Sequence, residues 1–144
     1  MDSFQEPWLR GPVAGIHPLL APVFYALTQA QEDLEKHTAD VTNTEVWSKP
    51  CGLAPVGFQL RHIAGSLDRL ATYLEGRGLS ERQLAFLHAE FEAGASLGEL
   101  IDGVRNAIRR ALEIVQTLDP DKLAEARSVL RYTLRSTPND MWGR

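Results

Sequence analysis

Residues 55–74 read PVGFQLRHIAGSLDRLATYL, and this stretch decides the fold. Its apolar residues recur at alternating steps of four and three, which places them on one stripe of an α-helix. They are Val56, Leu60, Ile63, Leu67, Leu70 and Leu74. At about 100° per residue, His62 falls on an adjacent polar face. It shares that face with Gln59, Ser66, Arg69 and Tyr73. We therefore predict a helix over 55–74 with a core-facing stripe and an imidazole beside it.

Three further helices are predicted from apolar spacing and capping residues. The first runs from about Leu19 to Lys36, with Pro22 in its first turn, where a missing N–H costs little. The capping box Ser80-Glu81-Arg82-Gln83 begins a short helix that reaches about Glu92. A second box, 96–99, begins the most regular segment, which keeps its four-three spacing to Leu118. Asp119 then caps a turn or two that extend through Leu130.

The remaining segments read as irregular. Residues 1–18 form a lead-in rich in proline and glycine, His37–Gly52 is a connector that Trp47 pins to the helices, and 131–144 is a tail of loop formers. No period-two strand pattern occurs. The prediction is a single all-α domain over 1–144. It has three long helices where a four-helix bundle needs four.

Composition narrows the class of protein. The 144 residues are 44% hydrophobic and 24% charged, as in ordinary globular domains. A net charge of −4 argues against a nucleic-acid partner. No apolar run is long enough to span a membrane, the N-terminus does not read as a signal peptide, and one cysteine excludes an intrachain disulfide. We expect a cytoplasmic protein.

Chemical motifs are sparse. The sequence shows no serine-histidine-aspartate set, phosphate-binding glycine loop or cysteine-histidine zinc spacing. Glu45, Glu90 and Glu92 are available as general bases, but spacing selects none of them, and the catalytic residues stay unknown.

Several side chains have two readings. His62 is either a metal ligand or a histidine on the polar edge of a helix. His88 and Glu92 form an i, i+4 pair that reads as a ligand pair or as a solvated face. Cys51 precedes the 55–74 helix and reads as a reactive thiol or as packing. Ser66 and Arg69 would orient a substrate or simply face solvent.

The order of these features resembles the DinB/YfiT-like family of small bacterial four-helix-bundle proteins. The resemblance extends broadly from His17 to Leu134. The residues that carry it are Trp47, the 50–57 turn, the run FQLRHIAGS at 58–66, Leu70, Tyr73-Leu74, Gly76, Leu79-Ser80 and Gln83-Leu84. The resemblance implies an up-down-down-up bundle. Characterised relatives include metal-dependent thiol S-transferases and a maleylpyruvate isomerase.

The resemblance also implies a zinc or nickel ion held by three histidines, with His62 as the first ligand. The family's other two ligands form an H-x-x-x-H pair on the last long helix, and this sequence has no such pair. The prediction is therefore a bundle with a truncated or atypical last helix and an incomplete metal site. Whether a divalent ion is retained stays open.

Two functions follow from this reading. The first is a metal-dependent thiol S-transferase or hydrolase acting on a small thiol or other small molecule, with the missing ligands supplied by a partner or by other side chains. The second is a non-catalytic, stress-associated bundle that self-associates or binds an apolar ligand. Because a missing helix exposes an apolar groove, we expect a homodimer or higher oligomer under either reading.

Overall fold

The computed structural model describes residues 5–124, and within that range the chain forms helices and no strands. The α-helices are α1 (Ala21–Thr38), α2 (Val56–Leu74), α3 (Glu81–His88) and α4 (Leu97–Thr117). Short 3₁₀ helices occur at Pro7–Leu9, Glu45–Trp47, Pro50–Gly52 and Pro120–Lys122. The all-α prediction is confirmed. The predicted turns from 125 to Leu130 and the predicted tail over 131–144 lie outside the described residues.

Both predicted capping boxes are present. The backbone N–H of Gln83 donates to Ser80 Oγ at 3.3 Å, and the Ser80 N–H donates back to Gln83 Oε1 at 2.9 Å. The same exchange joins Ser96 and Glu99, at 3.3 and 2.8 Å. The Ser96 N–H and the Ser96 hydroxyl both donate to the Glu99 carboxylate, and they hold its pKa below its usual range. Local sequence therefore determines where α3 and α4 begin.

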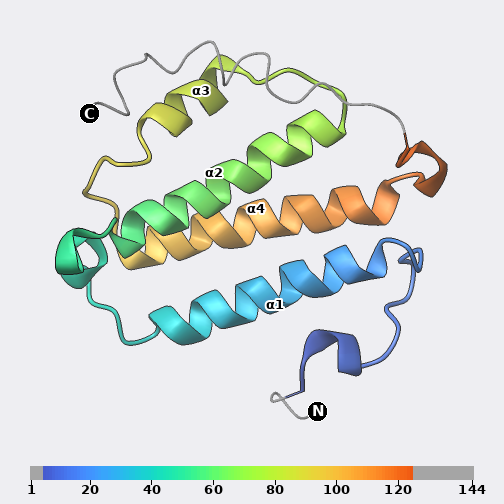
Figure 1. The fold of residues 1–144 in the computed structure, drawn as a ribbon, viewed down its shortest axis with the longest axis horizontal. Coiled ribbons are helices and arrows are strands. Elements are labelled where there is room, and N and C mark those ends of the chain that lie inside the picture. The colour runs from blue at the N-terminus through green and yellow to red at the C-terminus, as the bar shows by residue number, and fades with distance from the viewer. Residues whose placement is uncertain (1–4, 125–144) are drawn as a thin grey trace.

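The helices lie side by side in a row (Figure 1). The central helix α4 packs most extensively on α2 and less extensively on α1, while α3 packs on the far side of α2. Following the colour in Figure 1, α2 and α4 run in one direction and α1 runs in the other. The helices described over residues 5–124 do not confirm a four-helix bundle, so the bundle type stays a prediction. None of the helices in this range is both long and apolar enough to cross a membrane.

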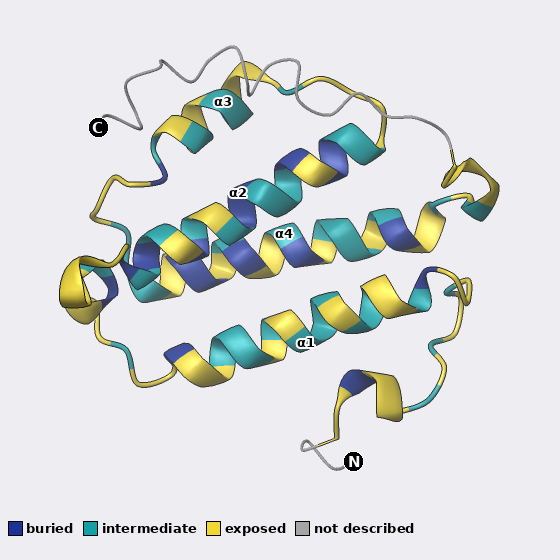
Figure 2. Ribbon diagram, viewed as in Figure 1, coloured by how far each residue is buried: buried dark blue, intermediate teal, exposed yellow. Residues whose placement is uncertain are grey.

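The core lies mainly between α2 and α4, where Figure 2 shows most of the buried positions. Leu60 is 1% exposed and Ile108 is fully buried. The other members of this cluster are Val46, Ala64, Leu100, Ile101 and Val104. Burial of each large apolar side chain contributes about 1.5–3 kcal/mol. Among the described residues, the α2–α4 contact is therefore the main source of stability.

One part of the α2 prediction is wrong. Leu70, assigned to the core stripe, is 57% exposed, whereas Ala64 and Ala71 are buried. A second four-three series, beginning at Gly57 and passing through Leu60, overlaps the predicted one. Its glycine and alanine positions let neighbouring elements approach α2 closely, so the buried face is rotated toward them.

Trp47 pins the connector to the helices, as predicted. Its indole N–H donates to the carbonyl of Ala95 at 2.8 Å. A Cβ on Gly57 would lie 2.8 Å from the indole ring, so only glycine allows this contact. Trp47 thereby joins the connector, the start of α2 and the approach to α4.

Candidate functional site

His62 lies on α2 with about half of its side chain exposed, as its predicted polar face required. Its Nδ1 atom is 2.8 Å from Oε2 of Glu90, a residue just after α3. Glu90 is only 3% exposed. The site therefore pairs a solvent-facing imidazole with a buried carboxylate.

Arg69 binds the other oxygen of the Glu90 carboxylate. Its Nη1 donates to Glu90 Oε1 at 2.8 Å, and its Nη2 donates to Ser66 Oγ at 3.1 Å. Arg69 is itself 8% exposed, so the reading of its side chain as a solvent-facing group is wrong. A buried carboxylate is tolerated only when a cation and hydrogen bonds satisfy it, and Arg69 and His62 supply these contacts.

The segment that carries Glu90 is anchored to α2 by the residue next to His62. Arg61 Nη1 donates to the carbonyls of Ala89 and Glu92, at 2.8 and 2.5 Å. The Arg61 guanidinium also lies 5.1 Å from the centroid of the Trp47 ring, in a cation–π contact. These contacts fix the backbone on both sides of Glu90 and so hold its carboxylate within hydrogen-bonding distance of His62.

Gly65 leaves the space in which the carboxylate sits. A Cβ at this position would lie 2.7 Å from Arg69 Nη1, 2.8 Å from Glu90 Oε1 and 2.9 Å from the Phe86 ring. Real Cβ atoms do not approach other atoms this closely. Glycine is therefore required at 65 for the Arg69–Glu90 contact to form without displacement.

Aromatic rings cover one side of the imidazole. Phe58, one turn before His62, stacks on it with ring centroids 5.6 Å apart, and Phe91 stacks on Phe58 at 3.9 Å. Phe91 remains 65% exposed. The imidazole thus has an apolar neighbour beside a solvent-accessible nitrogen.

Ser66 lies one turn after His62, with its Oγ 3.5 Å from His62 Nε2. Together with the Glu90 contact, this places a hydroxyl, an imidazole and a carboxylate in sequence. When Nδ1–H donates to the carboxylate, Nε2 of the neutral ring is left as a proton acceptor. This arrangement provides a general base oriented by a third group, as acid–base and nucleophilic catalysis require.

The described residues do not fit the three-histidine metal centre that the family resemblance implies. Within residues 5–124, no group of three or more histidine, cysteine, aspartate or glutamate side chains is placed to hold a metal ion. His62 offers only Nε2, and both Glu90 oxygens are already engaged. Metal binding at His62 stays a prediction.

The other candidates lie apart from this cluster. Cys51 is exposed in the 3₁₀ turn that precedes α2, so its reading as buried packing is wrong. His88 ends α3 with its side chain exposed, and Glu92 is also exposed. Glu45 accepts hydrogen bonds from Thr42 in the connector, which hold the pKa of its carboxyl below the usual range.

Sequence reasoning placed His62, Ser66 and Arg69 on one face but did not identify their partner. Glu90 is 28 residues beyond His62 and was one of three equivalent glutamates. A glutamate directly after a short capped helix gives no spacing signal of its own. One indication was present in the sequence: Arg69 lies on the same helix face as His62. If that face is buried, the arginine needs a carboxylate as its partner.

Searches of protein-family models, curated proteins and solved structures give no match to this chain. The resemblance to the DinB/YfiT-like family therefore rests on the sequence features given above and stays a prediction.

Proposed function

We propose that this chain is a DinB/YfiT-like transferase or hydrolase of small molecules in which His62 acts as the general base. The observation that carries the proposal is the 2.8 Å contact between His62 Nδ1 and the buried Glu90 carboxylate. A proton on Nδ1 that is donated to Glu90 leaves Nε2 of the neutral ring as the proton acceptor.

In the proposed reaction, a small thiol or hydroxyl compound gives its proton to His62 Nε2. The freed electron pair on sulfur or oxygen forms a bond to an electrophilic carbon, and the leaving group departs with the electron pair of the bond that breaks. Nε2 then gives the proton to the leaving group, or to solvent where the leaving group is as weak a base as chloride. Glu90 stabilises the imidazolium formed in between, and Arg69 keeps the carboxylate in place.

The test compares His62→Gln with His88→Gln. His88 is an exposed histidine at the end of α3 and serves as a matched control. The probes are cysteamine with chlorodinitrobenzene for thiol transfer and p-nitrophenyl acetate for hydrolysis. General-base catalysis contributes about 10²–10⁴-fold, so His62→Gln should abolish measurable turnover above the uncatalysed rate while His88→Gln retains it. Equal rates in both variants and the wild type would contradict the proposal.

A second candidate function is self-association through the outward side of α2. Leu70 is 57% exposed although it belongs to the apolar stripe at 56–74, and Ile63 and Leu67 on that stripe are only half-buried. We propose that a second copy of the chain covers this face, since monomers rarely leave contiguous apolar stripes open. Light scattering after size exclusion should then report a dimer that Leu70→Glu dissociates. A monomeric wild type at micromolar concentration would reject this candidate.

A further inference from the structure

A cavity of about 560 Å³ lies between α2, α3 and α4. Its floor is made by small residues of the two long helices, Ala64 and Gly65 on α2 and Gly103 and Ala107 on α4. His62 does not line it, so the cavity is distinct from the proposed general base. Its volume falls within the range of small-molecule sites.

Positive charge dominates the cavity wall. Four arginines line it, at 69, 77, 82 and 110, together with a single acidic residue, Asp68. Such a concentration is unexpected in a chain whose net charge is −4. It therefore marks a local basic site on an acidic protein.

Three of these arginines are paired with carboxylates. Arg69 binds Glu90, Arg110 binds Asp68 and lies 3.4 Å from Glu75, and Arg77 also binds Glu75. Four guanidinium groups thus meet three carboxylates. The wall retains one uncompensated positive charge and several unused N–H donors.

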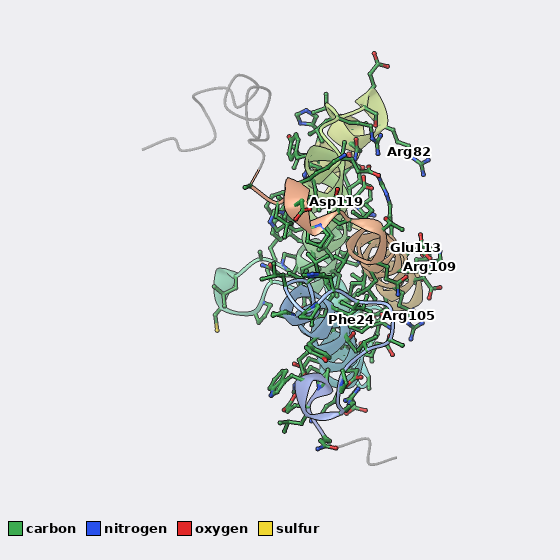
Figure 3. All side chains as sticks on the ribbon, turned by 90° about the vertical axis from the view of Figure 1, so that its right-hand side faces the viewer. Phe24, Arg82, Arg105, Arg109, Glu113 and Asp119 are labelled. Atoms are coloured by element: carbon green, nitrogen blue, oxygen red, sulfur yellow. The ribbon has the colours of Figure 1, made fainter. Side chains whose placement is uncertain are left out.

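The fourth arginine is Arg82 of α3. Among residues 5–124 its guanidinium has no hydrogen-bond or ion-pair partner, and the residue is exposed at the cavity rim. Figure 3 shows Arg82 on the same side of the molecule as Arg105 and Arg109 of α4. Arg105 is paired with Glu35 and Asp102. Arg82 is therefore the cavity cation most available to a ligand.

An aromatic wall completes the cavity. Phe86 lies one turn after Arg82 on α3, lines the same space and is 42% exposed. A guanidinium beside an aromatic surface suits a ligand with an anionic group on an apolar body, because planar N–H donors match carboxylate and phosphate oxygens.

We infer that this cavity binds a small organic anion, with its carboxylate or phosphate group on Arg82 and its apolar body against Phe86. The inference goes beyond the proposed function, because it assigns a second site and does not depend on His62. The bound anion would compensate the charge that the surrounding carboxylates leave unmatched.

Calorimetric titration with benzoate, phenyl phosphate and inorganic phosphate tests the inference. Arg82→Gln is compared with Arg109→Gln, which removes the same charge from the same side of the molecule without lining the cavity. A charge-assisted hydrogen bond accounts for about tenfold in affinity or more, so Arg82→Gln should weaken binding of an aromatic anion by at least that factor. Arg109→Gln should change it by less than about twofold, as expected for a screened surface charge.

The stronger of benzoate and phenyl phosphate identifies the anionic group. A preference for either over inorganic phosphate that Phe86→Ala removes would confirm the apolar wall. The inference is overturned if neither aromatic anion binds at about 10 mM, if Arg82→Gln binds as the wild type does, or if Arg109→Gln weakens binding equally. Circular dichroism of each variant establishes that it is folded.

Discussion

Glu90 connects the chemistry of the site to the stability of the chain. Replacing it by alanine leaves Arg69 buried without a carboxylate. Removing one partner of a buried ion pair typically costs about 3–5 kcal/mol. We therefore expect Glu90→Ala to lower the free energy of unfolding in urea by that amount. Glu92→Ala, two residues away and exposed, should change it by less than about 0.5 kcal/mol. Similar losses in both variants would show that the Glu90 contacts contribute little.

The Arg69–Glu90 contact can also be tested by adding a single methyl group beside it, at Gly65. Because its Cβ would overlap Arg69, Glu90 and Phe86, Gly65→Ala should destabilise the chain. Gly98, in the first turn of α4, serves as the control, because a Cβ at that position would have no neighbouring atom within 4 Å. There the same substitution should stabilise by up to about 1 kcal/mol, as alanine does in helices. Thermal melts of the two variants measure the difference, and a stabilised Gly65→Ala variant would contradict the geometry.

Helical periodicity predicted which residues share a face of one helix, but not which residues of other elements they contact. His62, Ser66 and Arg69 share a face because they lie at steps of four and three on one helix. Their partner Glu90 was not predictable, since its position depends on how α3 ends and on the Arg61 contacts to Ala89 and Glu92. These are tertiary contacts, which leave no local pattern.

At the scale of elements, one ion pair joins α1 to α4, and another joins the N-terminal segment to α1. Arg105 of α4 donates to Glu35 of α1 at 2.8 Å, and Arg10 binds both oxygens of Glu32 at 2.5 and 2.6 Å. The Arg105 hydrogen bond holds the pKa of the Glu35 carboxyl below its usual range, and Arg10 does the same for Glu32. Both pairs are partly exposed, so each stabilises only modestly.

These shifts set the direction of a pH dependence. A carboxyl whose pKa is lowered in the folded state contributes stability above its unfolded pKa and loses it as pH falls through the folded value. The melting temperature should therefore fall on acidification below the ordinary glutamate range, and Glu35→Gln should reduce that fall. Glu113→Gln on α4, at an exposed carboxylate that forms no hydrogen bond or ion pair among the described residues, should keep the wild-type dependence. Identical pH profiles in Glu35→Gln and wild type would exclude this contribution.

Helix boundaries were predictable to within a few residues, whereas the buried face of α2 was only partly so. Capping boxes act through bonds over three residues, so Ser80 and Ser96 mark the starts of α3 and α4 directly. Two overlapping four-three series run along α2, and both pass through Leu60 and Leu67. Which series is buried depends on the partner helix, so the exposure of Leu70 was not predictable.

At the scale of the whole molecule, the helices described over residues 5–124 lie in a row, and the bundle type stays a prediction. The central helix α4 has α2 on one side and α1 on the other, so the described residues leave apolar positions of α2 accessible. The class all-α followed from periodicity alone. The arrangement of the long helices did not, because a closed bundle and an open row use the same amphipathic helices.

The metal content of the whole protein tests the part of the family resemblance that the described residues do not fit. One imidazole nitrogen holds a divalent ion weakly, so protein purified without a histidine tag should carry well under one zinc or nickel per chain. Atomic absorption on wild type and His62→Ala measures this. Near-stoichiometric metal that disappears in His62→Ala would instead show that other ligands complete the site. The folded fraction of His62→Ala, followed by circular dichroism, controls for misfolding.

The central claim is that Glu90 orients His62 so that Nε2 is the free base, and nitrogen-15 NMR of the imidazole rings tests it most directly. At a pH where the ring is neutral, His62 should carry its proton on Nδ1, with the nitrogen shift of Nε2 typical of an unprotonated atom. The exposed His88, whose ring has no hydrogen-bond partner within residues 5–124, provides the internal reference. A neutral His62 with its proton on Nε2 would contradict the claim.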